Sequence, residues 1–220
     1  MISVDQLRLL ALDATEAPGE PLAALEAQLI RLAVAVSVTS LDETAIQQAI
    51  GSAFEAGATP AQVQEISSLV SGLGVHSLMA SSVAIIEKAR AAGFVIDGEL
   101  DVPRQKLWDR YVGNDPFWTG FEKELPGFLR SMLILSPDQF EAFFSYCAVP
   151  WKSGQVRAKV KELAAMACDA TPAHRFLPGF KLHLANAVAL GAGSLALDEA
   201  LAIAAAAPLH AGTGRWASGG

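Results

Sequence analysis

An internal repeat limits the fold of this chain more than any other feature. The second half matches the first without a gap at an offset of 134 residues, the difference between positions 29 and 163. The matched pairs are Leu29 and Leu163, Ala33 and Ala167, Ala53 and Ala187, Gly57 and Gly191, Ala58 and Ala192, Glu65 and Glu199, and His76 and His210. Helical chains share leucine and alanine by chance, so the Gly-Ala pairs and the histidines carry most weight. The repeat predicts two copies of one helical hairpin unit, packed about a pseudo-two-fold axis so that each buries the apolar face of the other.

The composition predicts that both copies are helical. Of the 220 residues 52% are hydrophobic and only 7% are aromatic, and alanine, which loses least on entering a helix, is abundant. The hydrophobic spacing and the breaking residues predict helices over 4–15, 21–38, 40–57, 59–72, 75–93, 128–135, 137–148, 154–169, 180–190 and 194–208. Residues 94–103 and 171–179 are expected to be loops. The predicted fold class is all-α, with two tandem pseudo-symmetric helical repeats.

Local signals place the ends of several of these helices. Capping patterns are expected at Ser40 with Glu43, at Thr59 to Gln62 and at Ser136 to Gln139, and Ser194 is expected to cap the last helix. Gly57 and Gly191 are suited to a left-handed helix end. The run Val149-Pro150-Trp151 is expected to break the chain between two helices.

These elements divide the chain into four predicted segments. Residues 1–93 form a degenerate N-terminal repeat, and residues 136–211 form a C-terminal repeat with the candidate site. Residues 94–135, which include Trp108, Tyr111 and Trp118, are an aromatic-rich helical connector between them. Residues 212–220 are expected to be a flexible tail.

Charge and composition exclude several classes of partner. The formal net charge of -7 argues against nucleic acid, which requires a basic face. The first ten residues lack a signal-peptide layout, and the most apolar run, 195–209, is too short and too charged to span a membrane. Cys147 and Cys168 are far apart in sequence and form no Cys-x-x-Cys motif. We therefore expect a cytoplasmic protein with reduced thiols, no nucleic-acid partner and no membrane partner.

The two copies differ where chemistry is expected. Positions 162, 174 and 183 carry a glutamate and two histidines, and the matching positions carry Gln28, Ser40 and Ala49. The joint loss of three ionisable groups indicates one functional unit, although drift at surface positions gives the same pattern. The candidate catalytic residues are therefore Glu162, His174 and His183, and the candidate substrate-binding residues are Arg175, Lys181, Asn186 and Trp151.

Proton transfer is the chemistry that these residues favour. His183 is expected to begin a helix beside a cleft, with the Glu162 carboxylate holding one ring nitrogen and raising its basicity. His174 is a second candidate proton carrier, and Arg175 and Lys181 offer positive charge to an anionic substrate. The alternative interpretation is a buried and satisfied Glu–His pair without chemistry. The spacing of the three groups lacks a metal-binding pattern, so neither a metal nor another cofactor is expected.

The second copy resembles the carboxymuconolactone decarboxylase and alkylhydroperoxidase D-like family. The resemblance lies in Glu162 within an apolar helix, in the run from His183 through Ala187 to Gly191-Ala192, and in the acidic Glu199 of the next helix. It covers most of the chain outside residues 93–136 and the tail. Redox members of the family carry a Cys-x-x-Cys shortly before the histidine, which this sequence lacks, and the spacing from Glu162 to His183 is about two residues longer than usual.

The resemblance implies a cofactor-independent lyase of the decarboxylase type, acting on a small carboxylated or lactone metabolite. One alternative is a peroxiredoxin-like antioxidant enzyme, which would have to use Cys147 and Cys168 and is disfavoured without the Cys-x-x-Cys motif. A second alternative is a non-catalytic oligomer that binds a small molecule. Chains of this family associate, so a homo-oligomer with a trimer-like or hexamer-like arrangement is also expected.

Overall fold

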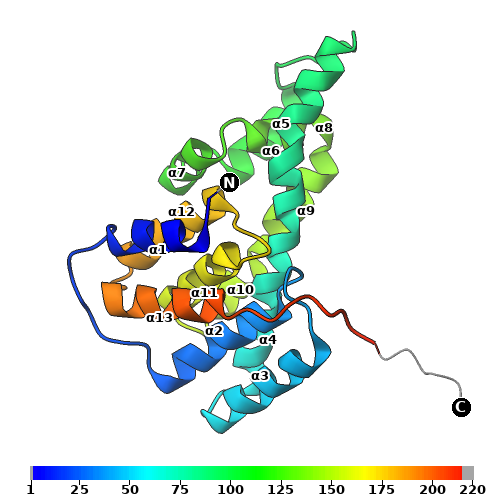
Figure 1. The fold of residues 1–220 in the computed structure, drawn as a ribbon. Coiled ribbons are helices and arrows are strands. Elements are labelled where there is room, and N and C mark those ends of the chain that lie inside the picture. Colours follow the sequence, from blue (N-terminus) through cyan, green and yellow to red (C-terminus); the bar gives the residue numbers. More distant parts are fainter. Residues whose placement is uncertain (1, 215–220) are drawn as a thin grey trace, which may run out of the picture. The chain divides into compact units, whose positions relative to one another are not determined.

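The computed structural model describes residues 2–214 and is built from helices (Figure 1). Within that range the β-structure is limited to one isolated bridge between Asp42 and Gly212. The helices are α1 (Val4–Leu12), α2 (Ala24–Val36), α3 (Glu43–Glu55), α4 (Pro60–Ser71), the 3-10 helix η1 (Gly72–Val75), α5 (His76–Ala91), α6 (Val102–Tyr111), α7 (Pro116–Glu124), α8 (Phe128–Leu135), α9 (Pro137–Cys147), α10 (Val149–Ser153), α11 (Ala158–Ala170), α12 (Leu177–Ala189) and α13 (Ser194–Ala205). The predicted all-α class is confirmed. The predicted tail begins at Gly212, and its residues 215–220 lie outside the described range.

The chain forms two compact units. The repeat unit contains residues 2–73 and 150–214, and the middle unit contains residues 74–149. These divisions differ from the predicted boundaries at 93 and 135. Helix α5, which was assigned to the first repeat, packs against α8 in the middle unit, and α9, which was assigned to the second repeat, also packs against α8. Each copy therefore supplies fewer helices to the repeat unit than its predicted segment contains.

The internal repeat is present in the helices themselves. Adding 134 to the bounds of α2, α3 and α4 gives the bounds of α11, α12 and α13. The correspondence ends there, because α4 is followed by η1 and α5, whereas the described residues after α13, 206–214, are not helical. His76 begins α5 and His210 lies in non-helical chain, so the histidine pair that supported the repeat lies outside the repeated helices.

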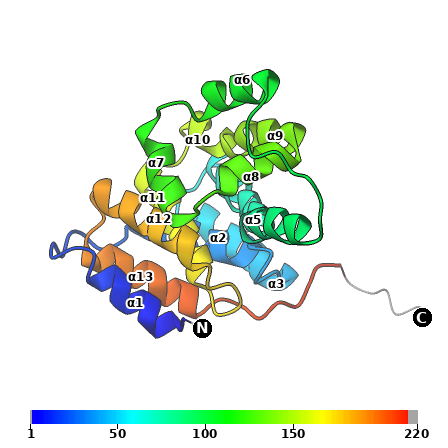
Figure 2. The same cartoon turned by 90° about the horizontal axis from the view of Figure 1, so that it is seen from above.

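Helices α2 and α11 form the centre of the repeat unit. They pack against each other, and each also contacts the second and third helices of its own copy. The third helix of each copy additionally packs on the first helix of the other, α13 on α2 and α4 on α11. Helix α1 lies beside α13, as both views show (Figures 1 and 2). This exchange gives the repeat unit one shared apolar core, in which α11 is buried from Val160 to Ala170.

The helix ends combine confirmed and corrected predictions. Thr59 and Gln62 form the expected capping box of α4, and the Ser136 side chain accepts a hydrogen bond from Gln139. Ser40 does not cap α3, because Asp42 accepts from the Ala45 amide at 2.7 Å and Ser40 is buried before the helix begins. Ser194 is likewise not a cap. Gly193 occupies that position without a side chain, and its Cα lies against Gly19, where a larger residue would collide with the backbone.

The Gly-Ala pairs close α3 and α12 in the same way. Gly57 and Gly191 have φ angles of 91° and 85°. The amides of the following residues, Ala58 and Ala192, donate to Ala53 and Ala187 at 2.9 Å in both copies. This is the Schellman helix end, in which a glycine in the left-handed region lets the chain satisfy the last carbonyls.

The middle unit contains α5 to α9 and a cluster of aromatic side chains. The Tyr111 ring stacks on Phe144 at 5.0 Å, and Trp118 meets the same ring edge-on at 4.9 Å. Residues 92–101 are not helical, which agrees with the loop predicted there. The predicted break at Val149-Pro150-Trp151 is wrong, because these residues begin the short helix α10, whose proline lies in the first turn.

The helical segment Pro60–Ala91 is long and apolar enough to cross a membrane by length and composition alone. It has 32 residues, and 33% of its most apolar window is buried within the protein. Core helices of globular proteins pass the same test, so one such segment is weak support for a membrane partner. The expectation of no membrane partner stays a prediction.

Candidate active site

The site is built on α11 and α12, the first two helices of the second copy, which pack against each other. Glu162 lies on the first part of α11 and only 6% of it is exposed. His183 and Asn186 lie three residues apart on α12, so they share one face of that helix. His183 occupies the interior of α12 rather than its beginning, because α12 starts at Leu177 instead of the predicted position 180.

Both carboxylate oxygens of Glu162 are engaged by α12. Oε2 lies 2.7 Å from Nδ1 of His183, and Oε1 accepts a hydrogen bond from the Asn186 amide at 3.2 Å. The structure therefore brings Glu162 and His183 together, as the sequence hypothesis required. Asn186 fixes the carboxylate, and its predicted contact with substrate stays a prediction.

The surroundings raise the pKa of His183 above its ordinary value of 6.5. Burial acts in the opposite direction and is the largest single effect, since it disfavours the charged ring. The hydrogen bond and charge of Glu162, with the charge of Asp169, outweigh it. The ring thus holds a proton at higher pH than a free histidine, and Nδ1 is committed to Glu162, which leaves Nε2 to exchange a proton with a reactant.

Asp169 is a site residue that the sequence interpretation missed. It is fully buried near the end of α11, and its Oδ1 lies 3.5 Å from Nε2 of His174. An added Cβ at Gly179 would collide with its carboxylate, so a larger residue there would have to displace the Asp169 side chain. The matching position in the first copy is Ala35. The comparison of the two copies, which selected Glu162, would therefore also have selected Asp169. Asp169 is an acidic residue inside an apolar helix, and it lies two turns beyond Glu162 on the same face of α11.

The loop between the helices carries His174 and Arg175, and the other predicted groups, Lys181 and Trp151, lie outside it. The ring of His174 stacks on Phe176 with 5.7 Å between the ring centres. Arg175 has a φ angle of 48°, the one non-glycine residue in the left-handed region among those described, and its buried Nε makes no hydrogen bond within the same range. Lys181 is exposed on the first turns of α12. Trp151 lies elsewhere, against the side chain of Lys161.

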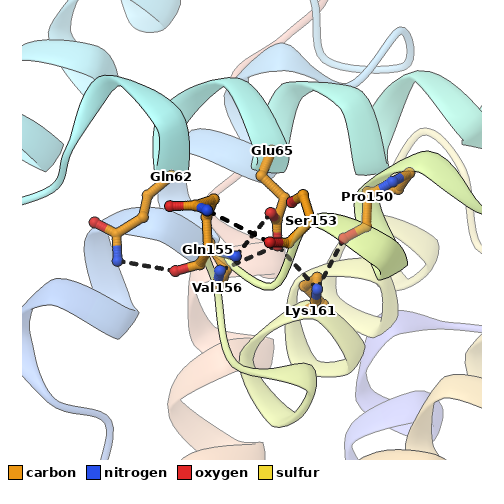
Figure 3. Close-up of polar contacts among 7 residues, drawn as sticks. All are labelled: Gln62, Glu65, Pro150, Ser153, Gln155, Val156 and Lys161. Atoms are coloured by element: carbon orange, nitrogen blue, oxygen red, sulfur yellow. Dashed lines mark hydrogen bonds and ion pairs between the residues drawn. The ribbon is translucent and has the colours of Figure 1, made fainter.

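Lys161, next to Glu162 in sequence, belongs to a separate buried cluster (Figure 3). Its ammonium group donates to Glu65 at 2.9 Å and to the Pro150 carbonyl at 2.8 Å, and it lies 5.3 Å from the centre of the Trp151 ring. The Glu65 carboxylate also accepts from the backbone amides of Gln155 and Val156. Burial alone would raise the pKa of Glu65, but these donors lower it, so the carboxylate stays charged. The cluster joins α4 of the first copy to α11 of the second.

Neither cysteine is placed for thiol chemistry. Burial raises the pKa of Cys147 to about 11, and burial together with the charge of Asp169 raises that of Cys168 well above 9.0. Both are free thiols. Because the thiolate is the reactive form, neither side chain has the character of a peroxidatic cysteine near neutral pH.

A comparison with solved structures places this repeat-built helical fold in a known family. The chain is similar to a crystal structure from Burkholderia xenovorans LB400, provisionally described as a gamma-carboxymuconolactone decarboxylase subunit, with a TM-score of 0.70 and 31% sequence identity. The match covers 83% of this chain and 71% of that one. The protein belongs to the carboxymuconolactone decarboxylase and alkylhydroperoxidase D-like family. No protein-family model and no curated protein matches the chain.

Proposed function

We propose that this carboxymuconolactone decarboxylase-like protein is a cofactor-independent lyase that removes carbon dioxide from a small carboxylated lactone. The observation that supports it most directly is the 2.7 Å contact between Glu162 and His183, with the pKa of His183 raised above 6.5. An imidazole with one nitrogen held by a carboxylate is a general acid suited to pH near 7.

In this proposal His183 supplies the proton that the substrate takes up when it loses carbon dioxide. The bond between the substrate carbon and its carboxylate breaks, carbon dioxide leaves, and the electron pair delocalises into the conjugated lactone carbonyl to give an enolate. Nε2 of the protonated ring then protonates a carbon of this enolate, and the ring regains its proton from water. Glu162 stabilises the imidazolium state, and Asn186 keeps the carboxylate in position.

The segment from His174 to Lys181, which contains the end of the loop and the first turns of α12, is the proposed substrate-binding side. Arg175 has a buried Nε without a hydrogen bond among the described residues and a backbone held in a sparsely populated conformation. Strained residues of this kind concentrate at ligand-binding positions. A guanidinium group matches the geometry of a carboxylate, and Lys181 adds a second positive charge at the surface.

The test is carbon dioxide release from a panel of carboxylated lactones that begins with γ-carboxymuconolactone. We expect His183→Ala to lower kcat by about a hundredfold or more, the usual contribution of a general acid. Glu162→Gln should lower kcat and move the high-pH limit of activity to lower pH, because the pKa of the ring falls.

Matched controls come from the first copy. Gln28→Ala and Ser52→Ala change the positions equivalent to Glu162 and Asn186 and should leave turnover unchanged. Full activity in His183→Ala would contradict the proposal. The absence of turnover by the wild-type protein on every compound, with saturable binding retained, would favour the non-catalytic binding protein.

The proposed active form is a homo-oligomer. Phe54, Leu190 and Leu195 of the repeat unit are each between 45% and 47% exposed in the single chain. Contact with a second copy would remove these apolar side chains from water, and the family resemblance supports the same proposal.

A further inference from the structure

A surface groove between α2 and α13 is the two-fold counterpart of the pocket that Lys161 fills. It has a volume of about 230 Å³ and is lined by Leu22, Ala27, Arg31, Glu199, Ala202 and Ile203. All six residues lie in the repeat unit, and none belongs to the Glu162–His183 site. Its chemistry can be inferred from the occupied counterpart.

The occupied pocket lies between α4 and α11 (Figure 3). Its base is the Glu65 carboxylate, which is fixed by the backbone amide of Val156 at 3.0 Å. The butylammonium side chain of Lys161 fills the remaining space, with its charged end on Glu65 and only 2% of the residue exposed. The pocket therefore has a carboxylate at its base and accommodates an alkylammonium chain above it.

The groove repeats this arrangement without the lysine. At the offset of 134, Glu65 corresponds to Glu199, Val156 to Leu22 and Lys161 to Ala27. Glu199 accepts a hydrogen bond from the Leu22 amide at 2.8 Å, the same contact that Val156 makes with Glu65. Ala27 ends at its Cβ, so the space that the lysine chain occupies in the other half remains open here.

A second charge distinguishes the groove from its counterpart. Arg31 lines the groove, whereas the matching residue in the other half is the buried Ala165. Within the described residues no ion pair joins Arg31 to Glu199, although both line the same groove. The other lining residues, Leu22, Ala27, Ala202 and Ile203, are apolar. The groove thus offers an anion site, a cation site and an apolar wall.

We propose that this groove binds a small aliphatic amino acid, with its ammonium group on Glu199, its carbon chain where the Lys161 chain lies in the other half, and its carboxylate on Arg31. An alkylammonium group fits the Glu199 carboxylate as Lys161 fits Glu65, and a carboxylate is the usual partner of a guanidinium group. The site is independent of the proposed lyase chemistry.

Calorimetric titration of the full chain with three probes of equal carbon count tests the proposal. The probes are γ-aminobutyrate, n-butylammonium and butyrate. We expect γ-aminobutyrate to bind most tightly, n-butylammonium to bind more weakly and butyrate to bind weakest. Glu199→Gln should weaken γ-aminobutyrate binding at least tenfold, and Arg31→Met should remove its advantage over n-butylammonium. Failure of γ-aminobutyrate to bind, or equal binding by Glu199→Gln, would overturn the proposal.

Replacement of Ala27 provides a test that does not depend on the choice of ligand. Ala27→Lys restores the residue of the other half, so its side chain should occupy the groove, block γ-aminobutyrate and raise the Tm. Ala27→Gln has a similar length without the charge and should block binding without the rise in Tm. In the Glu199→Gln background the gain from Ala27→Lys should disappear. An unchanged or lower Tm for Ala27→Lys in the wild-type background would contradict the equivalence of the two pockets.

Discussion

At Glu162 a single carboxylate is held by two donors from the same helix. His183 and Asn186 are separated by one turn of α12, so the ring and the amide reach the two oxygens from one side. The contact decides which nitrogen of the histidine is available. With Nδ1 on Glu162, only Nε2 is able to take part in proton transfer.

The first prediction concerns the pKa of His183. Titration followed by NMR of the imidazole ring should give a value above 6.5, and Glu162→Gln should lower it, because the hydrogen bond and the charge that offset burial are lost. Each unit by which the pKa exceeds 6.5 corresponds to about 1.4 kcal/mol of stability. A value that is the same in both proteins would show that Glu162 does not control the ring.

The sign of the pH effect on stability follows from the raised pKa. The contribution of the charged pair is fully present below pH 6.5 and is lost as the pH rises through the folded-state pKa of His183. The difference in unfolding free energy between the wild type and Glu162→Gln should therefore be larger at pH 6 than at pH 9. Chemical denaturation at the two pH values measures it.

At the scale of the helix, α3 and α12 end with the same backbone conformation although most of their side chains differ. Gly57 and Gly191 share the left-handed conformation, and the hydrogen bond that follows each has the same length. The second and third helices of each copy meet at these turns, so the turn sets the direction of the third helix. This geometry accounts for the presence of the Gly-Ala pair in both copies. Glu162, His174 and His183 have no such role in the turns, and the first copy has no equivalents of them.

The second prediction concerns these turns. Gly57→Ala and Gly191→Ala should each lower the free energy of unfolding by about 1–2 kcal/mol, because a Cβ is unfavourable in the left-handed region. No atom lies within 4 Å of either added Cβ, so the cost should be similar at both positions. Urea denaturation measures it.

Gly51 provides the matched control. It lies inside α3 with a helical backbone, and an added Cβ again meets nothing within 4 Å. Gly51→Ala should therefore stabilise the protein by about 0.5–1 kcal/mol. A loss of stability at Gly51, or none at Gly57 and Gly191, would show that backbone conformation does not set the energies of these sites.

At the scale of the molecule, a glutamate in the third helix of each copy binds the backbone just before the first helix of the other copy. Glu65 in α4 accepts from the backbone that leads into α11, and Glu199 in α13 accepts from the backbone that leads into α2. The acidic residue of the family pattern therefore has a structural contact in both copies. Because these contacts cross between the copies, neither copy completes its own packing alone.

The third prediction separates the two equivalent glutamates. Glu65→Gln leaves the Lys161 ammonium buried without its counter-charge and should cost about 3–5 kcal/mol of unfolding free energy. Glu199→Gln removes an exposed charge that has no buried lysine opposite it, so its cost should stay below about 1 kcal/mol. Equal costs in thermal or urea unfolding would contradict the account of the buried pair.

Much of the fold could be predicted from the sequence, because the residues that specify the helices and their ends act locally. Capping residues, left-handed glycines and hydrophobic spacing act within one or two turns, so the repeated helices were predicted close to their observed bounds. The comparison of the copies also selected Glu162 and His183 without coordinates. Errors remained where two local signals competed, as at Ser40 and Asp42, which lie two residues apart before the same helix.

Only the tertiary structure decided the features that depend on contacts between different segments of the chain. The sequence determined the helices, the repeat and the pairing of Glu162 with His183, because each rests on residues close in sequence or on a direct match between the copies. It did not determine the assignment of α5 and α9 to the middle unit, the Glu65–Lys161 pair or the groove beside Ala27. The Glu65–Lys161 pair and the groove arise where residues more than ninety positions apart come into contact, and α5 and α9 join the middle unit through their packing on α8. Local propensity carries no information about which surfaces will meet.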